Sequence, residues 1–203
     1  MRIEISKIPE VLENSNERMV VIGQPKEVGL TTVLIDFFSK KMFFEEDFSV
    51  LILVNDIRIK NKIAQMFEDF LESFYDFKTK FNYSNNTLKV YNNVVVIISY
   101  SNNDLAIVEN VESNFKFAYS FVEKDEDDEV LNKYLTDYLP FQSNRIVIAT
   151  YDTENSVYYM PEDENVLKIN VYSELSKQNI QNLNRISDYT LNYEKIIKGL
   201  FND

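Results

Sequence analysis

The chain has 203 residues, with 33 Asp and Glu against 21 Lys and Arg, which gives a formal net charge of −12. It contains no cysteine and no histidine, which excludes disulfides, thiol catalysis, the common zinc sites and imidazole acid–base chemistry. So acidic a surface disfavours nucleic acid unless positive charge gathers in one place, and the sequence shows no Lys/Arg cluster of that kind.

Short apolar, β-branched runs alternate with stretches of helical spacing. This alternation predicts an α/β fold, in which a twisted, mainly parallel sheet carries helices on both faces. The predicted strands are Met19–Ile22, Phe48–Val54, Phe115–Val122, Arg145–Thr150 and Val166–Tyr172. A hairpin is predicted at Thr87–Tyr91 and Val94–Tyr100, with its turn at Asn92-Asn93. The predicted helices are Thr31–Phe43, Ile57–Phe74, Glu129–Leu139 and Ser187–Phe201.

The sequence predicts one domain over residues 1–203, with 1–16 as a lead-in segment. No stretch is rich enough in Pro, Gly or Ser to divide it. The N-terminus has no apolar core of the signal-peptide type, and no run approaches the roughly 18 apolar residues that span a bilayer. We therefore expect a cytoplasmic protein with no membrane partner.

Two of the three glycines, Gly23 and Gly29, enclose one short loop between the strand Met19–Ile22 and the helix Thr31–Phe43. A strand, a glycine loop and a helix together aim backbone N–H groups and a helix N-terminus at a phosphate. The candidate nucleotide-binding residues are Gly23, Lys26, Gly29, Thr31 and Thr32.

The loop departs from the common phosphate loop, in which a lysine and then Ser or Thr follow two glycines five residues apart. Here the glycines are six apart, and Leu30 stands at the lysine position. Thr31 remains in place as the magnesium hydroxyl, and Lys26 could swing in from the start of the loop. Glu27 puts a negative charge where a tetra-anion would lie. The alternative is an ordinary strand–helix turn, with Thr31 or Thr32 capping the helix.

Three segments follow one another in an informative order: Lys26-Glu27-Val28-Gly29-Leu30-Thr31-Thr32, Phe117-Ala118-Tyr119-Ser120-Phe121-Val122-Glu123-Lys124 and Arg145-Ile146-Val147-Ile148-Ala149-Thr150-Tyr151. With the helices and hairpin between them, they resemble the ATPase domain of the large terminase subunit of tailed, T-even-like bacteriophages. The resemblance runs from about Glu17 to Phe201. In that family the first segment reads Arg-Gln-x-Gly-Lys-Thr-Thr, the second is the Walker B strand ending Asp-Glu, and the third is the coupling strand ending Thr-Thr-Pro.

The resemblance implies a P-loop NTPase-like fold with altered chemistry. In one register Glu123 stands at the magnesium-holding aspartate and Lys124 at the water-orienting glutamate. In the other, Val122 replaces the aspartate and Glu123 becomes the glutamate. Either register loses one of two carboxylates, and loss of a catalytic base costs roughly 10²–10⁴ in rate. Glu123 is thus the candidate catalytic residue and, with Thr31, the candidate magnesium ligand.

Acidic residues are concentrated in Glu123-Lys124-Asp125-Glu126-Asp127-Asp128-Glu129. Asp125 or Glu126 could supply the missing carboxylate, or Asp127 or Asp128 could cap the following helix in a solvated loop. A third hypothesis makes Asp125, Glu126, Asp127 and Asp128 an interface that attracts a basic protein surface.

The resemblance implies a phage-encoded, catalytically inactive terminase-like domain, without bound cofactor, that binds a packaging component or a host protein. Alternatives are an active ATPase component of a packaging motor that uses ATP and Mg²⁺, or a minor capsid or assembly protein. The implied location is the cytoplasm of the infected bacterial host or the virion. The family carries a nuclease domain after the ATPase; this sequence ends at Asp203, so none is expected here. We also expect no binding to duplex DNA.

Overall fold

The computed structural model describes residues 2–24, 29–74, 79–100, 116–124, 129–151 and 166–172. The chain divides after Tyr172 into two units, and every described residue belongs to the first, Met1–Tyr172. The helix expected at Ser187–Phe201 lies outside the described residues. The single domain over 1–203 stays a prediction.

The described residues form an eight-stranded sheet in the order β1-β8-β2-β7-β6-β3-β5-β4. The strands are β1 (Arg2–Glu4), β2 (Met19–Gln24), β3 (Ser49–Val54), β4 (Thr87–Val90), β5 (Asn93–Ser99), β6 (Phe117–Lys124), β7 (Ser143–Tyr151) and β8 (Val166–Tyr172). Of their pairings, that of β4 with β5 is antiparallel, and the others are parallel. The predicted α/β fold with a mainly parallel sheet is therefore confirmed.

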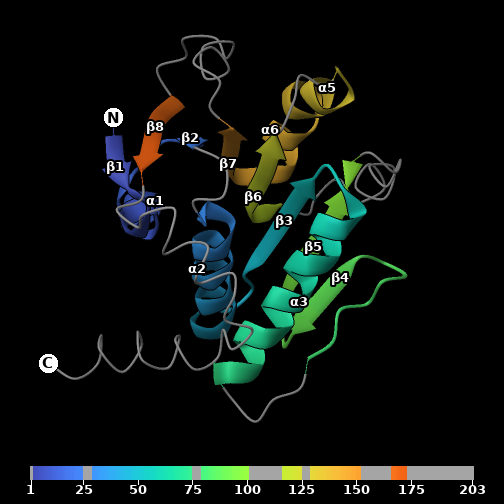
Figure 1. Ribbon diagram of the computed structural model, residues 1–203. Helices are drawn as coiled ribbons and strands as arrows, with labels where there is room; N and C mark the ends of the chain where they lie inside the picture. The colour runs from blue at the N-terminus through green and yellow to red at the C-terminus, as the bar shows by residue number, and fades with distance from the viewer. Residues whose placement is uncertain are drawn as a thin grey trace, which may run out of the picture. The chain divides into compact units, whose positions relative to one another are not determined.

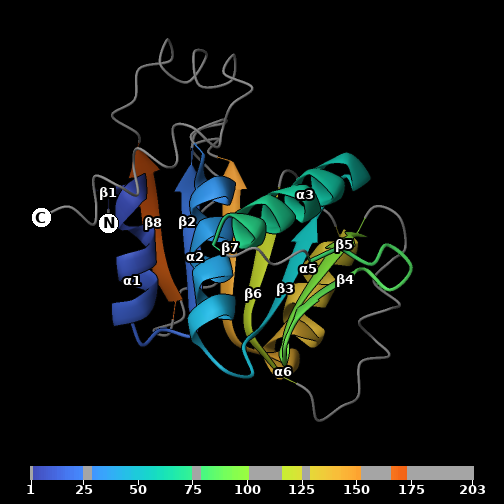
Figure 2. The ribbon, with the colours of Figure 1, turned by 90° about the horizontal axis from the view of Figure 1, so that it is seen from below.

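Helices cover both faces of this sheet (Figures 1 and 2). One face carries α1 (Ile8–Asn14), α2 (Leu30–Phe44) and α3 (Ile57–Phe74), and the other carries α5 (Glu129–Asp137) and α6 (Leu139–Gln142). A 3₁₀ turn, η1 (Ile5–Lys7), joins β1 to α1. The two hydrophobic cores follow from strand alternation, because successive side chains of a strand point to opposite faces.

Helix α2 lies between α1 and α3 on its face (Figure 2). Its buried residues, which include Leu34, Ile35 and Phe38, therefore spread around much of its circumference. Helix α3 buries a single stripe with Ile63, Phe67 and Leu71, the spacing of an amphipathic helix. Its bounds are those predicted from the sequence.

Several predicted bounds are wrong by one or two residues. Strand β6 continues through Glu123 and Lys124, which were expected just beyond its end, because both residues pair with β7. The helix expected at Glu129–Leu139 ends at Asp137, and the short helix α6 follows, with Pro140 in its first turn.

The hairpin turn is also shifted by one residue, from Asn92-Asn93 to Tyr91-Asn92, because Val90 pairs with Asn93. Tyr91 takes the left-handed conformation, with φ of 53°. Asn93 is buried and begins β5. Its Oδ1 accepts the backbone N–H of Phe48 at 2.6 Å, and its Nδ2 donates to the carbonyl of Glu45 at 2.8 Å. Asn93 thus fixes the connection from α2 to β3.

Candidate functional site

The helix α2 begins at the carboxyl edge of the sheet, just after the end of β2. Strand β2 runs through Gly23 to Gln24, and α2 starts at Leu30, so Gly23–Thr31 spans the junction at the strand's carboxyl end, as predicted. Residues 25–28, which include Lys26, are outside the described residues. The first backbone N–H groups of α2 have no partner within the helix, as at any helix N-terminus, and they favour negative charge.

Gly29 caps this helix with its backbone alone. Its φ of 88° lies in the left-handed region that glycine adopts without a Cβ penalty, and its carbonyl accepts the N–H of Val33 at 3.1 Å. Because Gly29 is the N-cap, Thr31 and Thr32 are the second and third residues of the helix. The alternative in which one of these threonines caps α2 is therefore wrong.

Leu30 is the first residue of α2 and is a core residue, with 1% of its surface exposed. It belongs to the hydrophobic cluster that includes Leu34 of the same helix and Val54 of β3. Its side chain therefore points into the protein at the position where the resemblance places a phosphate-binding lysine.

The strands that carry the two halves of the predicted site end at the same edge of the sheet. Gly23 of β2 and Lys124 of β6 pair with the same residue of β7, Thr150. The prediction that the glycine loop and the end of the acid-bearing strand lie at the same edge of the sheet is thus confirmed. Strand β7 intervenes between them, so the ends of β2 and β6 are one strand apart rather than adjacent.

Glu123 and Lys124 point to opposite faces of β6. Glu123 has 5% of its surface exposed and shares its face with Phe121, which packs in the cluster of α1, α2 and α3. Lys124 shares its face with Val122, which packs against α5 and α6. The Lys124 Nζ donates to Asn132 Oδ1 of α5 at 2.8 Å. Glu123 therefore faces the layer of α2, and the Lys124 amine is directed away from it.

Sequence analysis missed other polar residues at this edge. Gln24, Ser99 and Thr150 lie at or next to the ends of β2, β5 and β7, and all three are buried. The Ser99 hydroxyl donates to the carbonyl of Asn55, the residue after β3, at 2.8 Å. The sequence signal that could have found them is the polar residue that ends each of these apolar strands. In open α/β sheets, ligands bind outside the carboxyl ends of the strands.

The described residues at this edge combine a helix N-terminus, threonine hydroxyls and one buried carboxylate. Among them, no group of three or more acidic side chains is close enough to hold a metal ion. Asp125, Glu126, Asp127 and Asp128 lie outside the described residues, so their roles as substitute carboxylates, caps or interface stay predictions. This edge can offer backbone N–H groups to an anion. Its described part provides a single buried carboxylate, Glu123, where phosphoryl transfer uses a metal ligand and a water-orienting group, and Asp56, which follows β3, is paired with Arg58.

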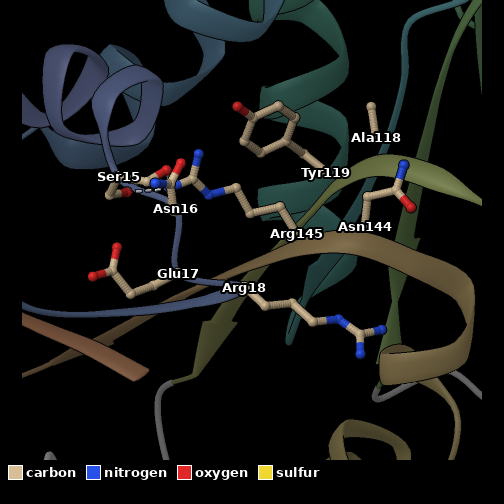
Figure 3. A pocket seen from close by; sticks show the side chains of 8 residues that line it. All are labelled: Ser15, Asn16, Glu17, Arg18, Ala118, Tyr119, Asn144 and Arg145. Carbon is tan, nitrogen blue, oxygen red and sulfur yellow. Dashed lines mark hydrogen bonds between the residues drawn. The ribbon is translucent and has the colours of Figure 1, made fainter. Parts of the chain in front are cut away.

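The described part of the chain also has an open depression at the opposite edge of the sheet (Figure 3). It is formed by residues 15–18 ahead of β2, residues 118–119 of β6 and residues 144–145 of β7, and its volume is about 440 Å³. No helix in the described residues is long and apolar enough to span a bilayer.

The fold is that of large terminase ATPase domains. The structure resembles the large terminase of a thermophilic bacteriophage, with a TM-score of 0.61 and 14% identity over 92% of this chain. For the same protein in complex with ADP, the TM-score is 0.59 and the identity 12%. The ATPase domain of the large terminase of Thermus phage P74-26 gives 0.55 and 9%, covering 88% of this chain and 83% of that domain. The chain spans about half the length of the first of these terminases, 50%. No protein-family model and no curated protein matches the sequence.

Proposed function

We propose that this chain is a terminase-type ATPase domain that has lost ATP turnover and acts in phage DNA packaging by binding another protein. The resemblance to phage large terminases supports the packaging role, since the fold is shared with them. Fold alone does not specify function, so the loss of turnover is argued from the site itself.

The observation that carries the proposal is the burial of Leu30. A phosphate-loop lysine supplies a charge-assisted contact of about 1.5–3 kcal/mol to the phosphates. Leu30 instead contributes its side chain to the core. The helix N-terminus retains its backbone donors, while the positive charge expected beside them is absent from this position.

The orientation of Lys124 supports the same proposal. We assign Glu123 to the magnesium-holding position, because α2 covers its face of β6, whereas Val122 packs on the opposite side. In this register Lys124 replaces the water-orienting glutamate, and an ammonium cannot accept the proton of an attacking water. ATP and Mg²⁺ are thus not expected as working cofactors.

The proposed partner is a protein, either a packaging component or a basic host protein. The net charge of −12 opposes association with duplex DNA and accelerates encounters with a basic surface. The run Asp125–Asp128 follows β6 directly and would contribute to that surface. Such a protein would act in the cytoplasm of the infected cell or on the particle.

Phosphate release from ATP tests the loss of turnover. The purified chain is assayed with Mg²⁺ beside an active phage large terminase ATPase domain, and together with a Thr31→Ala variant. We expect no release above the buffer control in either form of this chain. Turnover of about 1 s⁻¹ or more, within the ordinary enzyme range and abolished by Thr31→Ala, would establish the active packaging ATPase instead.

Fractionation of infected cells distinguishes the third hypothesis. Co-migration of the chain with purified particles, at a fixed ratio to the capsid proteins, would indicate a structural or assembly protein. A regulator of packaging is expected mainly in the particle-free fraction.

A further inference from the structure

Arg145 of β7 builds one wall of the depression at the amino edge of the sheet. Its guanidinium donates to the carbonyls of Leu12 and Ser15 and to the Ser15 hydroxyl, the second of these bonds being 2.8 Å. It also lies 5.9 Å from the ring centre of Tyr119. These contacts hold the end of α1 and the segment that follows it against the sheet, with a cation at the helix C-terminus.

Arg18 is arranged differently. Its side chain is exposed, and its Nη2 donates to the carbonyl of Ser143 at 3.1 Å. This contact positions the guanidinium at the lip of the depression near the start of β7. Glu17 also lines the depression, but its carboxylate points to the opposite side from the Arg18 guanidinium (Figure 3).

Neither Arg18 nor Arg145 pairs with a carboxylate among the described residues. In contrast, Arg58 binds Asp56 at 2.5 Å. In a chain with twelve more acidic than basic side chains, two arginines that line one depression and bind neutral oxygens stand out. A guanidinium with remaining donors is suited to bidentate recognition of a carboxylate or phosphate.

We propose that the depression binds a carboxylate side chain of an acidic, aromatic-bearing segment of a partner protein, with Arg18 as the anchoring residue. This inference rests on the proposed protein-binding role and assigns to that role a second surface, at the edge of the sheet opposite the carboxyl edge. Arginine and aromatic residues are enriched at protein interfaces, and buried arginine contacts are frequent hot spots.

The surroundings favour a polypeptide over nucleic acid. Exposed Asn16 and Asn144 line the depression and offer both donors and acceptors to a peptide backbone. The half-buried ring of Tyr119 also lines the depression and provides aromatic surface for a side chain of the segment. Two guanidinium groups in a chain of −12 do not make the extended positive track on which a phosphate backbone depends.

Fluorescence polarisation with a labelled synthetic peptide of alternating glutamate and phenylalanine tests the proposal. The full chain is titrated at low and physiological salt, alongside a peptide in which glutamine replaces each glutamate. The variant Arg18→Gln removes the charge but keeps an amide donor. Arg58→Gln is the matched control, because it removes the same charge from an exposed arginine paired with Asp56.

We expect the glutamate peptide to bind the wild-type chain, and Arg18→Gln to weaken binding at least tenfold, while Arg58→Gln leaves it within twofold. Absence of binding to the wild-type chain, equal loss in both variants, or equal binding of the glutamine peptide would each overturn the proposal. Displacement of the peptide by duplex DNA would also overturn it, in favour of a nucleic-acid site. None of these results depends on ATP turnover, so the proposed loss of turnover is tested separately by the phosphate-release assay.

Discussion

The Nζ of Lys124 lies 2.8 Å from Oδ1 of Asn132, so the last side chain of β6 is directed toward α5. Helix α2, which begins at the carboxyl edge, packs on the opposite face of the sheet. A residue at the end of this strand would need to approach the α2 N-terminus to act on a bound nucleotide. The Lys124 side chain binds Asn132 of α5 instead. Its place in the sequence, directly after Glu123, suggests a role beside the α2 N-terminus, but its amine lies on the other face of the sheet.

Replacing Leu30 with alanine is expected to reduce stability without changing nucleotide affinity. The side chain is buried in the core, and deletion of a buried leucine costs about 2–5 kcal/mol in the free energy of unfolding. Denaturant unfolding measures this cost. Thr31→Ala is the neighbouring control, and its partly buried side chain should change stability by less than about 1 kcal/mol.

A stable Leu30→Ala variant with altered ATP affinity would contradict this assignment. In that case the leucine would contact nucleotide rather than core. The comparison with Thr31→Ala separates the two results, since both residues belong to the first turn of α2.

The sequence predicted the strands and α3 well, because their apolar residues repeat with the period of the local structure. It could not predict β1, which has three residues and pairs with Asn170–Tyr172 at the far end of the described chain. It also misplaced the hairpin turn. Asn92 and Asn93 are locally equivalent, and the partners that bury Asn93 lie more than forty positions away.

The sequence likewise predicted only part of the candidate site. The glycine loop and Glu123 could be found from strand ends, since parallel strands bring their carboxyl ends to one edge. The burial of Leu30 and the direction of Lys124 depend on packing against other elements, which a motif does not contain. The depression around Arg18 has no sequence signal, because its lining comes from three separated segments.

Asn93→Ala is expected to destabilise the connection between α2 and β3. The substitution leaves the buried N–H of Phe48 without its acceptor, at a cost of about 1–3 kcal/mol. Asn92→Ala changes the exposed neighbour in the turn and should cost less than about 1 kcal/mol. Chemical denaturation of both variants checks the difference. Equal costs would show that the Asn93 bridge contributes nothing beyond the turn.

The pKa of Asp56 is expected to be low and to depend on Arg58. Side-chain hydrogen bonds from Arg58, followed by its backbone N–H, lower the pKa of Asp56 from 3.8 to about 2. Because the folded-state pKa is depressed, the stabilisation is complete above the unfolded value. It is lost as the pH falls from about 4, the ordinary value, towards the folded value. An NMR titration of the Asp56 carboxyl group measures this.

Arg58→Gln supplies the comparison for that titration. It removes the guanidinium and keeps the backbone N–H, so the Asp56 pKa should rise part of the way to its ordinary value. An unchanged pKa in this variant would assign the shift to the backbone hydrogen bond alone.

Neutralising the acidic run is expected to slow association with the proposed basic partner. Rim charges act mainly on the association rate, through the long-range field, and this effect weakens with salt. The test variant changes Asp125, Glu126, Asp127 and Asp128 to their amides. The matched control changes Glu46, Asp47, Asp69 and Glu72, which are exposed acids elsewhere in the chain, so both variants lose four negative charges.

Stopped-flow or surface-binding kinetics at low and physiological salt, against the partner captured from infected cells, measure the association rates. If the run contacts the partner, its variant should associate more slowly than the control at low salt, and the two rates should converge as salt increases. Equal rates for the two variants at low salt would mean that net charge alone steers the encounter. The partner would then bind another face, and the arginine-lined depression at the amino edge would be the next surface to test.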